Sequence, residues 1–110
     1  MLNIVMSRAA AALLRALLAR GGEQRHRILL SEIRSVDWQS LTLAGERHTL
    51  QLRVTGLDAE QTVARFIDGI EDAEFDIPGQ ILADIALVGP PRRDADGSVT
   101  VELEALTVLE

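Results

Sequence analysis

Two histidines and a few arginines are the side chains of this 110-residue chain that are best suited to chemistry. His48 directly follows Arg47 near the start of a predicted hairpin strand, and Arg53 lies further along the same strand. An exposed imidazole in such a place can act as a general base, although a histidine of this kind is more commonly a solvated residue at a strand edge. His26 and His48 have no metal-ligand spacing. We therefore interpret Arg47, His48 and Arg53 as the polar groups that would line a ligand or partner site.

Four carboxylates fall within six residues: Glu71, Asp72, Glu74 and Asp76. Oxygen ligands of this type suit Mg²⁺ or Ca²⁺, but the segment lacks the spacing and the glycine of an EF-hand loop. It lies at the end of a predicted helix, where the helix dipole already carries partial negative charge. We expect a solvated acidic loop that can receive an Arg-rich partner, with a metal site as the weaker alternative.

The linker between the last two predicted strands contains Arg92 and Arg93, which could contact a phosphate or a carboxylate. Asp94 and Asp96 nearly neutralise this pair. The sequence has no Gly-rich phosphate loop, no HExxH zinc motif and no GxSxG nucleophile motif. It also has no cysteine, which excludes disulfides and thiolate metal sites. We therefore expect no catalytic residue, no cofactor and no resident metal.

The charge of the chain is unevenly distributed. Residues 1–34 carry six Arg against two Glu, whereas the remainder is strongly acidic and brings the net charge to −6. An acidic surface repels nucleic acid, and an aromatic content of only 3% does not supply a base-stacking platform. All the basic residues are Arg, which we interpret as the mark of a GC-rich bacterial genome. Because arginines interrupt the one long apolar stretch, we expect no transmembrane helix and a cytoplasmic protein.

The segment from Arg47 to Val88 organises the fold. Residues 47–54 alternate polar and apolar side chains, which predicts a strand with Leu50, Leu52 and Val54 on its buried face. Residues 58–72 repeat apolar side chains at helical spacing, with Asp58 and Gln61 placed to form a capping box. Residues 81–88 predict a second strand, in which the following share one face: Ile81, Ala83, Ile85 and Leu87.

Residues 1–20 predict a further helix, because Ala and Leu dominate and Gly21-Gly22 ends the pattern. Its apolar seam consists of Leu2, Met6, Ala9, Leu13 and Ala16. We expect this helix to cover the sheet of its own domain. A dimer seam is one alternative, and a membrane-surface helix that uses Arg8, Arg15 and Arg20 is another.

The stretch 27–44 changes phase twice, which predicts a long bent strand or two short ones, with a bulge or kink near residues 35–39 and Trp38 packed across the bend. A turn at residues 44–46 would then pair Leu41 and Leu43 against Leu50 and Leu52. Residues 99–108 predict a final strand, with a phase change before Leu106.

The resulting element order is α-β-β-α-β-β over a single domain of residues 1–110. This is the order of a ferredoxin-like fold, circularly permuted by moving its first strand to the end: a two-layer α+β sandwich with helices on one face of an antiparallel sheet. The other face would be open. Six apolar residues fall out of phase with the predicted core and would lie there: Ile28, Leu30, Leu82, Val88, Leu106 and Val108.

From this architecture we expect a non-catalytic domain that acts by protein association, as a homodimer or with an assembly partner. Contacts for a ligand or partner would come from Arg47, His48, Arg53, Arg92 and Arg93. A small-molecule-binding domain or enzyme that uses the cleft between sheet and helices is the alternative, and a membrane-peripheral assembly factor is a third.

Overall fold

The structure is a computed structural model, and it describes residues 5–110. Its elements, in chain order, are α1 (Arg8–Arg20), the 3₁₀ turn η1 (Gly22–Arg27), β1 (Ile28–Gln39), β2 (Ala44–Val54), α2 (Ala59–Ile67), the 3₁₀ turn η2 (Ile70–Asp72), β3 (Gln80–Leu87), β4 (Arg92–Arg93) and β5 (Val99–Leu109). Among the described residues, no helix is long and apolar enough to cross a bilayer.

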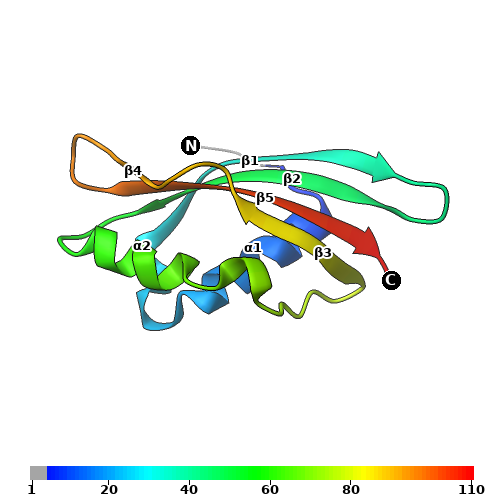
Figure 1. The fold of residues 1–110 in the computed structure, drawn as a ribbon, viewed down its shortest axis with the longest axis horizontal. Coiled ribbons are helices and arrows are strands. Elements are labelled where there is room, and N and C mark those ends of the chain that lie inside the picture. The colour runs from blue at the N-terminus through cyan, green and yellow to red at the C-terminus, as the bar shows by residue number, and fades with distance from the viewer. Residues whose placement is uncertain (1–4) are drawn as a thin grey trace.

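All five strands belong to one antiparallel sheet with the order β1-β2-β5-β3, and the short β4 pairs with the start of β5. Both helices lie on the same side of this sheet, and its other face is open (Figure 1). The core lies between the two layers and is built from aliphatic side chains and Phe66. The predicted α+β class, with an antiparallel sheet and helices on one face, is therefore confirmed.

Helix α1 begins at Arg8, where the predicted helix began at Met1. Ser7 caps it by accepting a hydrogen bond from the backbone N–H of Ala10. The predicted seam residues Ala9 and Leu13 are buried, together with Leu17, whereas Leu2 lies outside the described residues. Helix α1 thus covers the sheet of its own domain, as predicted.

Helix α2 buries Val63 and Phe66 as predicted but ends at Ile67, because Gly69 adopts a left-handed φ of +72° and starts a 3₁₀ turn. The predicted capping box is wrong. The carboxylate of Asp58 accepts a hydrogen bond from Arg27 at 2.5 Å and does not cap the helix. At the other end, the Arg20 guanidinium donates to the carbonyls of Phe66 and Asp68, which ties α1 to α2.

The two central strands are regular. In β2 the predicted core residues Leu50, Leu52 and Val54 are fully buried. The whole of β5 pairs with β2 without a register shift, so the predicted phase change before Leu106 does not occur. Leu106 and Val108 consequently face the open side.

The edge strands each contain one bulge. The register shifts at Ser31 in β1 and at Ala83 in β3. The predicted bend at residues 35–39 is wrong, because β1 is paired continuously there. The predicted shared face of β3 is also wrong: Leu82 packs on the core, and Ile81 is 49% exposed.

The turn of the first hairpin falls at residues 40–43, before the predicted position. Gly45 lies inside β2, where a Cβ atom would sit 1.9 Å from the carbonyl oxygen of Thr107, so only glycine fits. The predicted pairing of Leu41 and Leu43 with Leu50 and Leu52 is wrong. Both residues lie in the exposed turn.

Candidate interaction surface

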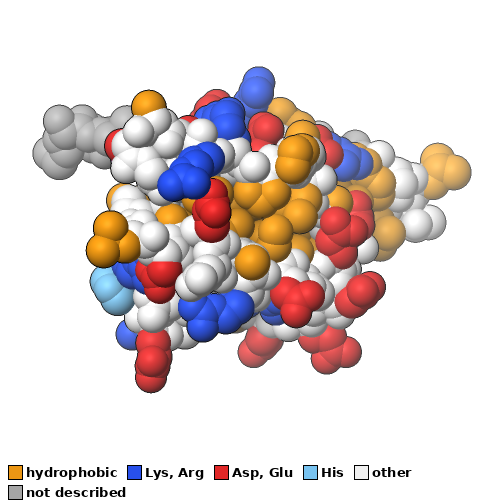
Figure 2. All heavy atoms as spheres, turned by 60° about the vertical axis from the view of Figure 1, so that its left-hand side comes forward, with side chains coloured by type: hydrophobic (Ala, Val, Ile, Leu, Met, Phe, Trp, Pro, Cys, Tyr) orange, Lys and Arg blue, Asp and Glu red, His pale blue; other side chains and the backbone are white. Residues whose placement is uncertain are grey.

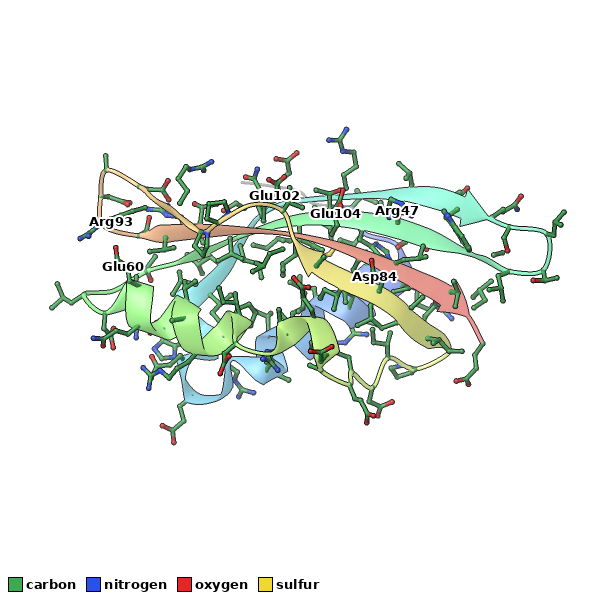
Figure 3. All side chains as sticks on the ribbon, in the orientation of Figure 1. Arg47, Glu60, Asp84, Arg93, Glu102 and Glu104 are labelled. Atoms are coloured by element: carbon green, nitrogen blue, oxygen red, sulfur yellow. The ribbon has the colours of Figure 1, made fainter. Side chains whose placement is uncertain are left out.

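The open face of the sheet is organised in rows that cross the strands. The register places one row at the end near the β1–β2 turn, consisting of Trp38, Gly45, Val108 and Ile81, and beside it a second row of Val36, Arg47, Leu106 and Asp84. We call these eight residues the distal rows. Adjacent to them lie the charged rows, which contain Arg34, Thr49, Glu104, Ala86, Glu32, Gln51 and Glu102. Figure 3 shows Arg47, Glu102 and Glu104 on the side of the sheet that faces away from the helices.

Exposed apolar side chains gather at this distal end of the molecule. Val36 is 53% exposed on β1 and Ile81 49% exposed on β3. The β1–β2 hairpin projects beyond both helices (Figure 1), so no part of the described chain covers its end. Five of the nine large apolar side chains that are exposed in residues 5–110 lie here: Val36, Leu41, Leu43, Ile81 and Leu109. Such a concentration is what an interaction surface shows, whereas single exposed apolar residues are ordinary.

Gly45 shapes the outermost row. It stands between Trp38 and Val108 in the register, and the close approach of the β5 backbone occupies the place of its missing side chain. Val108 is only 5% exposed, although it points away from the helices. The sequence suggested Trp38 as a ring packed across a bend; the structure makes it part of a flat apolar row.

The charged side chains of the open face are not neutralised by their neighbours. Residues 5–110 form four ion pairs, which join Arg27 to Asp58, Arg53 to Asp96, Arg92 to Asp94 and Arg93 to Glu60. None of these involves the charged side chains of the distal and charged rows: Glu32, Arg34, Arg47, Asp84, Glu102 and Glu104. Their charges are therefore available to another molecule that docks on this face.

His48 is not an exposed base. Its side chain is fully buried on the core face of β2, with Nδ1 2.7 Å from the Ser35 hydroxyl and Nε2 2.8 Å from the Thr107 hydroxyl. Burial lowers the pKa of His48 below its ordinary value of 6.5, and the nearby carboxylate of Glu46 opposes this shift. The two hydroxyl groups satisfy a neutral imidazole, so His48 is a core residue of this fold.

The remaining predicted arginines gather around the tight turn between β4 and β5. Arg53 donates to the Ser98 hydroxyl at 2.9 Å and pairs with Asp96, and Arg92 pairs with Asp94. A hydrogen bond from the Thr100 hydroxyl lowers the pKa of Asp94, and one from the Ser98 hydroxyl lowers that of Asp96. The fold thus brings the predicted residues Arg53 and Arg92 together, and their hydrogen bonds and ion pairs stabilise this turn.

The acidic segment does not form a metal site. Within the described residues, no three His, Asp or Glu side chains converge so that they could hold a metal ion. The weak candidates Glu71, Asp72, Glu74 and Asp76 are all exposed. They form a solvated acidic stretch at the surface.

A shallow groove of about 250 Å³ lies between α2 and the β4 segment. Figure 2 shows hydrophobic side chains gathered on this side of the molecule, with acidic and basic groups around them. The Arg93 guanidinium and the Glu60 carboxylate, 3.0 Å apart, line the groove together with Val63, Ala64, Ile67, Pro91 and Val99. Pockets that bury small ligands usually measure about 300–1,000 Å³, and this groove lies just below that range.

Sequence reasoning missed Val36, Leu41, Leu43, Ile81 and Leu109 as surface residues. Leu41 and Leu43 could have been identified as surface residues from their position between two alternating segments, where a turn is required. No protein-family model matches the chain, and a comparison with curated proteins gives no match either.

Proposed function

We propose that this domain is a non-catalytic association module that pairs with a second copy of itself through the open face of its sheet. The observation that carries the proposal is the exposure of Val36 and Ile81 on the open side of β1 and β3, at the end of the molecule where Leu41 and Leu43 of the first turn are exposed as well. Burial of apolar surface is the main driving force of protein association. A two-fold homodimer is the commonest way to bury such a surface.

The apolar residues that form this interface are not the six that the sequence suggested. Ile28, Leu30 and Leu82 pack on the core, because the two bulges change the side to which they point. Leu106 and Val108 do face the open side, and Val88 is 38% exposed beyond β3. Val36 and Ile81 take the place of the three core residues. The apolar surface is thus smaller, and most of it lies at the distal end.

Within residues 5–110, no helix or strand covers this face. The strand order β1-β2-β5-β3, with one helix before each pair of long strands, supports the circularly permuted ferredoxin-like sandwich. Such a two-layer domain leaves one sheet face in contact with solvent or with a partner.

Sedimentation equilibrium at protein concentrations from about 1 to 100 μM tests the proposal. We expect a reversible monomer–dimer equilibrium for the natural sequence and a monomer for Val36→Asp, because a buried unpaired carboxylate opposes association. Leu57→Asp is the matched control, since Leu57 is fully exposed in the β2–α2 connection, away from the distal rows. A natural sequence that stays at 12.0 kDa at every loading in moderate salt would overturn the proposal.

A further inference from the structure

We infer that the two copies pair about a two-fold axis that runs parallel to the strands, between β2 and β5, so that Arg47 of each copy meets Asp84 of the other. This inference rests on the proposed function and adds the geometry of the interface. It follows from how charge and apolar surface are distributed over the rows of the open face.

Charge is separated across the sheet. Arg34 and Arg47 lie on β1 and β2, whereas the open side of β5 and β3 carries Glu102, Glu104 and Asp84. Glu32 on β1 is the exception, and among the distal and charged rows it lies in the row furthest from the distal end. One half of the face is therefore rich in Arg and the other half is acidic.

Two sheets that pack face to face can be related by an axis along the strands or by an axis across them. An axis across the strands through the middle of the sheet would place the distal rows of one copy over the opposite end of the other, where Arg53 and Arg92 lie. An axis along the strands keeps each row at its own level and exchanges the two halves of the sheet. This second arrangement stacks the outermost rows of the two copies on each other and the Arg-rich half on the acidic half. It also keeps the strands of the two sheets roughly aligned, which is a common packing of β-sheets.

The outermost row fits this arrangement. Trp38 of one copy then lies over Ile81 of the other, and Val108 lies over Gly45. Each contact occurs twice, as an isologous interface requires.

The second row supplies the charge contact. Within one copy, Arg47 and Asp84 are separated by β5, a distance of about 10 Å at the usual spacing of neighbouring strands, and they form no ion pair. In the paired arrangement, Asp84 of the second copy lies one strand away from the point opposite Arg47. Packed sheets lie about 10 Å apart, and a long arginine side chain reaches across this gap to a carboxylate one strand away, so the dimer contains two such pairs.

Charge reversal tests this geometry, because Arg47 and Asp84 are both exposed and their replacement should not prevent folding. We expect Arg47→Glu and Asp84→Arg each to weaken dimerisation by about tenfold, since each variant places two like-charge pairs in its own homodimer. An equimolar mixture of the two variants should regain the dimer, because both pairs are then attractive. A single chain that carries both substitutions should also dimerise like the natural sequence.

The control is Arg15→Glu, which changes the net charge as Arg47→Glu does but lies on the exposed side of α1. Mixed with Asp84→Arg, it should not restore the dimer. If the natural sequence dimerises but the mixture of Arg47→Glu and Asp84→Arg does not recover, the axis is wrong and the proposed function stands. If the natural sequence is monomeric throughout, the proposed function fails and this inference with it.

Discussion

At the scale of single residues, His48 shows how position in a strand overrides chemical character. It shares the core face of β2 with Leu50, Leu52 and Val54, at the even positions of that strand. The alternation that predicted the buried face therefore already assigned His48 to it. Neighbouring Arg47 and Glu46 suggested exposure, but side-chain direction in a strand follows parity and not the polarity of neighbours. Its two hydroxyl partners, Ser35 and Thr107, come from the strands on either side.

The burial of His48 predicts a pH dependence of stability. Its pKa is lowered in the folded protein, mainly by burial, so the unfolded chain binds the proton first as the pH falls below about 6.5. The stability that His48 contributes is present above that pH and is lost progressively below it. Chemical denaturation at several values between about pH 7 and pH 5 should show a falling free energy of unfolding, and His48→Gln should flatten this decline. An unchanged slope in His48→Gln would contradict the assignment.

At the scale of elements, the two bulges decide which residues form the core. Ser31 and Ala83 each add one unpaired residue to an edge strand. Without them, strict alternation would place Leu30 and Ile33 on opposite faces, although both pack against the core. Helices α1 and α2 contain no comparable irregularity, and their apolar faces were predictable from periodicity alone.

Deletion of Ala83 tests the role of a bulge. It removes the extra residue but leaves Leu82 and Ile85 on the core face, so we expect cooperative unfolding with a loss of about 1 kcal/mol. Deletion of Thr49 is the matched control, because β2 is paired on both sides without a bulge around this residue. That deletion must turn half of the strand over and should abolish folding. Equal damage from the two deletions, measured by thermal unfolding, would show that the bulge is not dispensable.

At the scale of the whole molecule, the sheet is covered on one side only and projects beyond its helices at one end (Figure 1). The core lies between the two helices and the part of the sheet that they cover. The exposed apolar residues of the distal end have no cover within the described chain. A second copy would supply the missing layer at that end.

Such a dimer couples folding to association. Because the partner binds only the native state, the midpoint of thermal unfolding should rise with protein concentration. We expect this rise for the natural sequence between about 1 and 100 μM, and no rise for Val36→Asp. Calorimetric scans that superimpose at both concentrations for the natural sequence would argue against a native-state dimer.

The sequence by itself determined the elements whose side chains follow a single period. The core face of β2, the buried stripe of α2 with Phe66, and α1 as a cover for the sheet were all readable, because local sterics and burial of one face fix them together. Only the tertiary structure decided the bulges, the position of the first turn and the exposure of Val36 and Ile81. These depend on register against a neighbouring strand that is distant in sequence, as the close approach of Gly45 to Thr107 illustrates. The predicted site residues lie apart in the structure for the same reason. The sequence shows which residue types are present, but strand pairing across the sheet decides which of them come into contact.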